Sequence, residues 1–389
     1  MYYVTGTPPE RESVLLTGAT GFIGAHLCAR LLRTTPHRVF CLVRVKRDAH
    51  PTARLFPRLR ELGTSSAELT RVVPLRGNLA IPGLGLPSEI LDTFADEVTH
   101  IFHCGAWVSM AISQDALHST NLASTNQLIG LAERGRPKTV HYFSSIGVYG
   151  SARRIGLNKV DEHTPISAET SADMGYTQTK RAAEEMLRGA ATRGVRFVIH
   201  RPGQVLGDSG TGTYHNPTDV FNRLIATCVE LGIAPRTIGQ IPVCAVDYVT
   251  NAIVAVSMGL STRPTLLGRA FHLVEPEPLY MSDVFDHARS FGYHLSDVNF
   301  PEWEVRLRKD TESRSTLVLL AAWDAVCYLL APTPRYLFPH TRSELTRSVL
   351  AELEVPCPTS DQDFFHRAFS SMVSTGELPP PRRQPCLTH

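Results

Sequence analysis

Short apolar runs alternate with amphipathic stretches along the first half of the chain. Each run has the length of a strand and is mostly apolar, which is typical of parallel strands buried on both faces of a sheet. The expected strands are Val14–Leu16, Val39–Val43, Val72–Leu75, His100–His103, Val140–Phe143, Val195–His200 and Ala270–Val274. Strands that alternate with helices predict βαβ crossovers, and hence an α/β fold with a doubly wound parallel sheet of the Rossmann type.

Beyond Gly203 this alternation becomes irregular. A loop rich in Gly, Asn and Pro at residues 207–217 precedes a helix expected over Val220–Leu231, and the chain from about residue 276 is mostly helical. We therefore expect a smaller, mainly helical substrate lobe. The expected organisation is a linker or tail at 1–12, a dinucleotide-binding domain at 13–205 to which a strand within 240–275 returns, the substrate lobe at 206–239 and 276–380, and a flexible tail at 381–389.

The composition narrows the class of protein. With 389 residues, of which 43% are hydrophobic, the chain can bury a large core, and a net charge of +2 is too balanced to indicate nucleic-acid binding. The eight cysteines form no Cys-x-x-Cys pair and no cluster with metal-ligand spacing, so we expect free thiols, a cytoplasmic location and no metal site. The most apolar run, Leu317–Ala331, is too short to span a bilayer, so we expect a buried helix and no membrane association.

The first expected strand runs directly into a glycine loop. Gly18, Gly21 and Gly24 are followed by a helical pattern over Phe22–Leu32. Glycines let the backbone turn tightly and approach a pyrophosphate, and the amide groups at the start of the helix bind it. At the first strand of an α/β chain this arrangement predicts a nicotinamide dinucleotide site. The residues expected around the phosphates are Thr17, Gly18, Thr20, Gly21, Phe22, Ile23 and Gly24.

The end of the second expected strand indicates which dinucleotide is bound. An acidic residue there normally binds the ribose 2′-hydroxyl of NADH. This chain has Arg44 instead, with Arg54 at the start of the next helix, and the first acid, Asp48, comes late. A guanidinium suits a 2′-phosphate, so we expect NADPH, with a solvated basic loop as the alternative interpretation. Further cofactor contacts are expected at the strand ends from Asn78, Leu79, Gly105, Ala106 and Pro202.

A Tyr-x-x-x-Lys pair follows on a helical stretch. Tyr176 and Lys180 are four residues apart and therefore share a helix face. An ammonium near a phenol lowers the phenol pKa, so Tyr176 can exchange a proton during hydride transfer while Lys180 also binds the nicotinamide ribose. Ser145 ends the fifth strand, where its hydroxyl can stabilise a carbonyl oxygen. Asn121 is either a support for a neighbouring backbone segment or a helix cap.

These residues carry a family resemblance. The glycine loop, Ser145 and the Tyr176–Lys180 pair resemble the extended short-chain dehydrogenase/reductases. Five stretches are more specifically similar to the thioester reductase domains that end many nonribosomal peptide and polyketide synthases and occur in carboxylic acid reductases. These stretches are 14–27, 41–44, 175–180, 201–203 and 242–249.

The resemblance implies a reaction. It implies NADPH-dependent release of an acyl or peptidyl thioester from the phosphopantetheine arm of a carrier protein, as an aldehyde or further as an alcohol. Ser145 takes a position that is usually Thr, and Asn78 stands where many members have Asp. Tyr176 is retained, whereas fungal relatives that perform a non-redox Dieckmann cyclisation lose this tyrosine. We therefore expect Ser145, Tyr176 and Lys180 to be the catalytic residues, and we expect a monomer.

Other readings share parts of this pattern. A fatty acyl-CoA reductase performs the same chemistry on a soluble thioester, and a sugar-nucleotide epimerase or dehydratase shares the fold but keeps NAD bound, which Arg44 argues against. A Dieckmann-type release domain and a non-catalytic dinucleotide-binding module are further alternatives. The carrier could dock on basic residues of the second lobe, although a solvated helix face explains them as well. These residues are Arg306, Arg308, Lys309 and Arg314.

Overall fold

Seven parallel strands form the central sheet of the protein, in the order β3-β2-β1-β4-β5-β7-β12. A computed structural model describes residues 12–46, 49–108, 114–172, 174–214, 216, 219–310 and 313–381. The strands are β1 (Ser13–Thr17), β2 (Arg38–Val43), β3 (Val72–Arg76), β4 (Val98–His103), β5 (Thr139–Phe143), β7 (Arg196–Pro202) and β12 (Ala270–Leu273). The direction of winding reverses between β1 and β4, and this switch point is where doubly wound sheets bind ligands. The α/β class and the parallel sheet expected from the apolar runs are thus confirmed.

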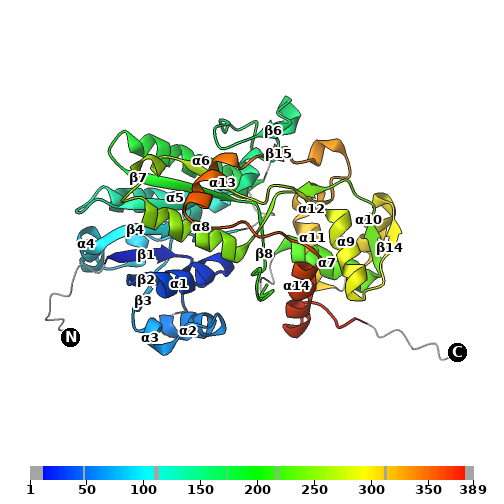
Figure 1. Ribbon diagram of the computed structural model, residues 1–389, viewed down its shortest axis with the longest axis horizontal. Helices are drawn as coiled ribbons and strands as arrows, with labels where there is room; N and C mark the ends of the chain where they lie inside the picture. The colour runs from blue at the N-terminus through cyan, green and yellow to red at the C-terminus, as the bar shows by residue number, and fades with distance from the viewer. Residues whose placement is uncertain are drawn as a thin grey trace.

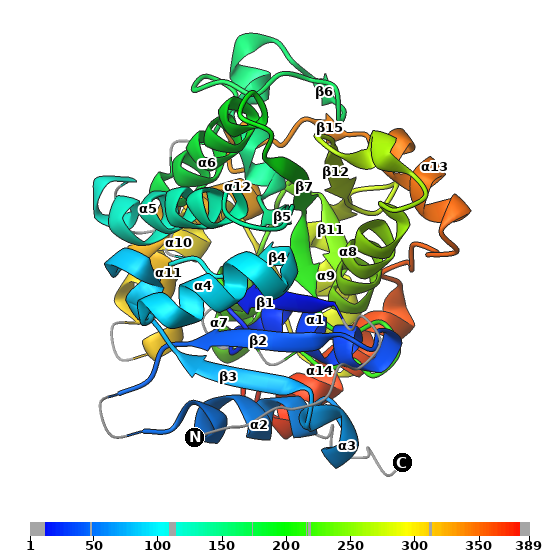
Figure 2. The ribbon, with the colours of Figure 1, turned by 90° about the vertical axis from the view of Figure 1, so that its left-hand side faces the viewer.

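Helices cover both faces of the sheet (Figure 2). One face carries α4 (Ser88–Glu97), α5 (Gln114–Ala132) and α6 (Gly175–Ala191), and the other carries α1 (Phe22–Thr34) and α8 (Val246–Gly259). Alternate residues of β1 enter different cores, because Leu15 packs with the α5–α6 side and Val14 with the α1–α8 side. Two helices beside β3 and one beside β12 complete this part. They are α2 (Pro51–Glu61), α3 (Ser66–Leu69) and α13 (Glu344–Glu352).

A second group of helices lies beyond the carboxyl ends of the strands, on the right of Figure 1. It comprises α7 (Val220–Leu231), α9 (Met281–Phe291), α10 (Phe300–Lys309), α11 (Arg314–Ala321), α12 (Trp323–Leu330) and α14 (Gln362–Ser374). Four two-stranded pairs also occur in the described part of the chain. They are β8 (Gln204–Leu206) with β11 (Val243–Ala245), β10 (Gln240–Ile241) with β13 (Leu279–Tyr280), β9 (Ile233–Pro235) with β14 (Ser296–Val298), and β6 (Lys159–Val160) with β15 (His340–Thr341).

The apolar run Leu317–Ala331 is not the single buried helix expected from the sequence. It belongs to α11 and α12, which meet at Ala322, where ψ is 36° and the N–H bonds to the carbonyls of both Val318 and Leu319. Leu317 is 51% exposed. No helix in the described part of the chain is long and apolar enough to cross a membrane.

Several sequence expectations fall on residues whose placement the structure does not describe. These are the terminal tails at residues 1–11 and 382–389 and the loop residues Arg47 and Asp48.

Candidate active site

A cavity of about 810 Å³ opens between the carboxyl ends of the strands and the second group of helices. It is lined by residues that follow β1, β2, β3, β4 and β5 and by the end of β7. All but one of the site residues predicted from the sequence line this cavity. The lining members are Gly18, Thr20, Gly21, Phe22, Ile23, Gly24, Arg44, Arg54, Asn78, Leu79, Gly105, Ala106, Ser145, Tyr176, Lys180 and Pro202.

The glycine loop leaves backbone surface open at the start of α1. Gly18 has a φ of +76°, and a Cβ there would lie 2.6 Å from the Gly105 nitrogen. A Cβ at Gly24 would lie 2.2 Å from the Gly18 carbonyl oxygen. Gly21 precedes α1, and no side chain caps the first amides of that helix. These amides and the helix dipole therefore fit a pyrophosphate that approaches the backbone closely.

Thr17 is the predicted cofactor residue that does not line the cavity. It is fully buried, and its Oγ1 accepts a hydrogen bond from the Gly105 N–H at 3.0 Å and bonds to His103 Nδ1 at 2.8 Å. The threonine thus joins the loops that follow β1 and β4 beneath the glycine loop. Its hydroxyl is already engaged by these two contacts.

Arg44 and Arg54 form the rim where the second strand ends. Both side chains are exposed, both line the cavity, and Arg54 Nη1 donates to the Arg44 carbonyl. Asn78 uses its Oδ1 to accept from the Ala80 N–H at 3.1 Å, so its amide closes a local turn. Two guanidinium groups at this rim fit the doubly charged 2′-phosphate of NADPH.

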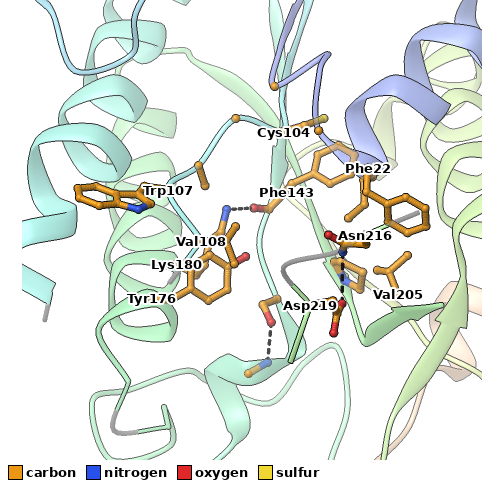
Figure 3. A pocket seen from close by; sticks show the side chains of 18 of the residues that line it. Phe22, Cys104, Trp107, Val108, Phe143, Tyr176, Lys180, Val205, Asn216 and Asp219 are labelled. Atoms are coloured by element: carbon orange, nitrogen blue, oxygen red, sulfur yellow. Dashed lines mark hydrogen bonds between the residues drawn. The ribbon is translucent and has the colours of Figure 1, made fainter. Parts of the chain in front are cut away.

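The Lys180 ammonium is buried against the end of β5. Its Nζ donates to the Phe143 carbonyl oxygen and lies 4.8 Å from the ring centre of Tyr142 and 5.5 Å from that of Tyr176 (Figure 3). Burial lowers the pKa of Lys180 to about 8, while Cys104 and Glu184 act in the opposite direction. The lysine is thus close to the Tyr176 ring, and one of its three N–H groups donates to a backbone carbonyl.

The expected lowering of the Tyr176 pKa is wrong for this arrangement. Desolvation raises the pKa of the Tyr176 phenol above its ordinary value. The cause is the burial of the tyrosine in the folded protein. The tyrosine is therefore a neutral phenol that can donate a proton.

The two serines after β5 have different tasks. Ser145 is partly exposed in the cavity, and its Oγ accepts from the Gly147 N–H at 3.0 Å, which leaves its own proton for a ligand. Ser144 is buried and donates to Glu184 Oε1 at 2.5 Å. The geometry therefore favours Ser145 as the hydroxyl that faces a substrate.

Sequence reasoning missed a buried ion pair behind these groups. Glu184 and Arg201 are 0% and 1% exposed, and two guanidinium nitrogens donate to the two carboxylate oxygens at 2.9 and 2.6 Å. Arg201 also donates to the Tyr149 hydroxyl at 2.7 Å. The signal was present in the sequence, because Glu184 follows Lys180 by one helical turn and Arg201 belongs to the quoted 201–203 stretch.

Asn121 supports a backbone segment and does not cap a helix. It lies inside α5, where its Oδ1 accepts from the Trp107 N–H at 2.7 Å and its Nδ2 donates to the Trp107 carbonyl at 3.2 Å. The same Nδ2 is 3.2 Å from Thr179 Oγ1 on α6. The amide therefore fixes the loop after β4 relative to the helix that carries Tyr176 and Lys180.

The second group of helices supplies a wall for which the sequence showed no motif. Small and apolar side chains from the start of α7, from the α11–α12 junction and from the segment after it face the cavity opposite the strand ends. They are Val220, Val318, Ala321, Ala322, Ala325, Leu329 and Phe338.

The two arginines of α10 pair with acidic residues of their own helix. Arg306 pairs with Glu302 at 2.9 Å, and Arg308 pairs with Glu304 at 2.8 Å and lies over the Trp323 ring. These pairs favour the solvated-face interpretation. The Arg314 side chain lies outside the described part of the chain.

The fold and site define an oxidoreductase built on a dinucleotide-binding sheet. A family model described as male sterility protein, an NAD-binding domain, matches residues 16–253. The chain belongs to this family of nicotinamide-dependent reductase domains.

Relatives of this chain are much larger proteins. One of the proteins that make up the linear gramicidin synthase of Brevibacillus parabrevis is 31% identical over 96% of this chain, which spans 7% of that protein. Isonitrile lipopeptide synthase of Streptomyces coeruleorubidus is 32% identical over 97% of this chain, which spans 25% of that protein. The chain thus corresponds to a small part of each curated relative.

Among solved structures, the terminal R domain of the myxalamid PKS-NRPS pathway has a TM-score of 0.86 and 33% identity. The match covers 97% of this chain and 94% of that one. The reductase domain of a nonribosomal peptide synthetase from Mycobacterium tuberculosis shares the fold, with a TM-score of 0.76 and 22% identity over 96% and 94% of the two chains.

Proposed function

We propose that the protein uses NADPH to reduce a thioester carried on the phosphopantetheine arm of a carrier protein, and so releases the acyl or peptidyl group as an aldehyde. A second round on the aldehyde gives the alcohol. The observation that carries the proposal is the meeting of Ser145, Tyr176 and Lys180 in one cavity with an uncapped helix start behind a glycine loop. The similarity to the myxalamid terminal R domain over nearly the whole of both chains supports it.

The cofactor would be held by groups that already line the cavity. The amides at the start of α1 would bind the pyrophosphate, Arg44 and Arg54 the 2′-phosphate, and Lys180 the ribose hydroxyls beside the nicotinamide. When bound, the nicotinamide supplies the hydride that reaches the thioester carbon. The proposal of NADPH over NADH rests on the two guanidinium groups at the end of β2.

Ser145 and Tyr176 would act on the carbonyl oxygen. The Ser145 hydroxyl, oriented by the Gly147 N–H, and the Tyr176 phenol donate hydrogen bonds to this oxygen and stabilise the negative charge that develops on it. Tyr176 then transfers its proton to the oxygen, which gives a hemithioacetal. Collapse of that adduct breaks the carbon–sulfur bond and releases the aldehyde and the pantetheine thiol.

The first experiment is NADPH oxidation with an acyl-pantetheine thioester, with the product identified by mass spectrometry. We expect oxidation with formation of aldehyde or alcohol. A cyclised product without oxidation would replace the proposal by the Dieckmann reaction. Tightly bound NAD in the purified protein would favour a sugar-nucleotide enzyme, and turnover of long-chain acyl-CoA without any carrier would favour a fatty acyl-CoA reductase.

A further inference from the structure

The cavity contains one carboxylate among its described lining residues, that of Asp219. Asp219 directly precedes α7, and its Oδ1 accepts from the Phe221 N–H at 2.7 Å. Its Oδ2 accepts from the side-chain amides of Gln204 at 2.9 Å and Asn216 at 3.3 Å. Figure 3 shows Asp219 and Asn216 together on the cavity wall.

These hydrogen bonds do not neutralise the carboxylate. Every donor that the structure describes for Asp219 is a neutral amide, and burial raises its pKa to about 6 although Gln204 and backbone amides act in the opposite direction. A carboxylate has about four acceptor positions, and the donors that face them here, the Asn222 N–H included, are all uncharged. A desolvated charge without a cationic partner is costly unless a bound molecule supplies a donor.

An apolar cluster begins at the residue after Asp219. Val220, the next residue, packs against a buried cluster that contains Met174, Ala322 and Ala325. Both alanines line the cavity, and Ala322 lies where α11 ends and α12 begins. We call this cluster, Met174, Ala322, Ala325 and Tyr328 with Val220 and Phe338 against it, the alanine chamber.

The alanine chamber contains residues that are close in the sequence to Tyr176 and to Asp219. Met174 comes two residues before Tyr176, and Val220 comes directly after Asp219. Tyr176, Asp219 and the residues of the alanine chamber all line this one cavity. This arrangement suits an acyl group whose α-carbon carries both an apolar side chain and a nitrogen with a proton.

We propose that Asp219 accepts a hydrogen bond from an N–H of the acyl group, so that the site selects aminoacyl or peptidyl thioesters over plain fatty acyl thioesters. The inference rests on the proposed function, and it names the substrate class of that site. The apolar side chain of the acyl group occupies the alanine chamber.

The test measures binding without turnover. Two pantetheine thioethers, which cannot be reduced, are compared by calorimetry. One carries an N-acetylated leucine-like group, and the other has CH₂ in place of the N–H. We expect wild type to bind the N–H ligand about tenfold more tightly, as one hydrogen bond to a charged group provides. The Asp219→Asn variant retains a good helix-capping residue but loses the charge, and its preference should fall to about twofold or less.

A matched control is the Asp361→Asn variant. Asp361 caps α14 in the same way, with its Oδ1 accepting from the Phe364 N–H at 2.9 Å, and it does not line the cavity. Its ligand preference should equal that of wild type, and NADPH affinity should be unchanged in both variants.

Several outcomes overturn the inference. Equal binding of the two thioethers by wild type, or no binding of either, removes the substrate role of Asp219 without any variant. If Asp219→Asn weakens the binding of both thioethers equally, the carboxylate binds an amide of the pantetheine arm. If it weakens the binding of NADPH, the carboxylate binds the nicotinamide. Because these are binding measurements, an enzyme that binds with the expected preference but oxidises no NADPH contradicts the proposed function alone.

Discussion

At the residue scale, the protonation state of Tyr176 determines the role that this side chain can play. Burial raises the pKa of its phenol, and Lys180 directs its Nζ at the Phe143 carbonyl. A phenol that keeps its proton at neutral pH still donates it to an alkoxide, which is a much stronger base. In the proposed mechanism Tyr176 therefore acts as a proton donor when charge develops on the carbonyl oxygen, and not as a phenolate.

Replacing Tyr176 by Phe removes this donor without removing the ring. We expect kcat for thioester reduction to fall about a hundredfold or more, because a general acid typically contributes that much. NADPH affinity and thermal stability should change little. The exposed Tyr280 provides the control, since Tyr280→Phe should be indistinguishable from wild type. Near-normal turnover by Tyr176→Phe contradicts the proton-donor role.

Arg44 is expected to set the choice of cofactor. The Arg44→Asp variant should lower the preference for NADPH over NADH about tenfold or more, because it replaces a charge-assisted hydrogen bond to the 2′-phosphate by repulsion. The ratio of kcat/KM values for the two cofactors measures the effect. Lys46→Asp is the control, since Lys46 is exposed and does not line the cavity. An unchanged ratio for Arg44→Asp identifies the arginine as part of a solvated loop.

At the element scale, the pair Glu184–Arg201 attaches α6 to the sheet. Glu184 belongs to α6, Arg201 to β7, and Ser144 at the end of β5 donates to the same carboxylate. The three elements that carry Lys180, Ser145 and Pro202 are thus fixed to one another by buried polar contacts. These contacts position the reacting groups, although neither Glu184 nor Arg201 lines the cavity itself.

Removing one partner of this pair should be costly. We expect Glu184→Gln to lower the free energy of unfolding by about 3–5 kcal/mol, because Arg201 keeps a buried and unpaired charge. The value of kcat should also fall by about tenfold to a hundredfold as Ser145 and α6 shift. Glu185→Gln, on the same helix, breaks only the partly exposed pair with Arg181 and should cost less than about 1 kcal/mol. Equal urea unfolding curves for the two variants would contradict the positioning role.

A row of histidines crosses three neighbouring strands on the α1–α8 side of the sheet. His100 Nδ1 on β4 is 3.0 Å from His141 Nε2 on β5, and His141 Nδ1 is 3.3 Å from His200 Nε2 on β7. Burial lowers the pKa of His100 to about 4 and that of His200 to about 3, and it lowers the pKa of His141 as well. The folded sheet therefore requires neutral imidazoles.

This row predicts loss of stability in mild acid. The unfolded chain takes up protons near the ordinary histidine pKa of 6.5, while the folded chain resists them until about pH 4, so the unfolding free energy falls as pH decreases through that window. Each unit of lowered pKa corresponds to about 1.4 kcal/mol. Thermal midpoints between pH 7 and 4 test this, and His100→Gln should flatten the decline whereas the exposed His163→Gln should not. A midpoint independent of pH contradicts it.

At the scale of the whole molecule, the sheet and the phosphate end of the site could be predicted from sequence. Strands buried on both faces appear in the sequence as apolar runs. Glycine is required at positions 18 and 24 because another backbone segment lies too close for a Cβ atom. The family motifs also located Ser145, Tyr176 and Lys180. All of these signals lie in short, continuous stretches of the chain.

Other features depend on contacts between distant segments, and the sequence could not provide them. Thr17 does not line the cavity, and its hydroxyl accepts a hydrogen bond from the Gly105 N–H. Burial of the phenol raises the pKa of Tyr176. The break at Ala322 is hidden in an apolar run, since neither glycine nor proline marks it. Asp219 lines the cavity because the fold places the start of α7 beside the strand ends, which the sequence does not reveal.

The two walls of the cavity come from separate stretches of the chain. The strand ends provide one wall and lie before residue 206, whereas the opposite wall comes from the start of α7, from α11 and α12 and from the segment after them. On the proposed function, mutations in the second wall therefore alter the space for the acyl group without touching the groups proposed to bind the phosphates or to move the proton. Such a chain can acquire new products during evolution while its reducing chemistry is inherited intact.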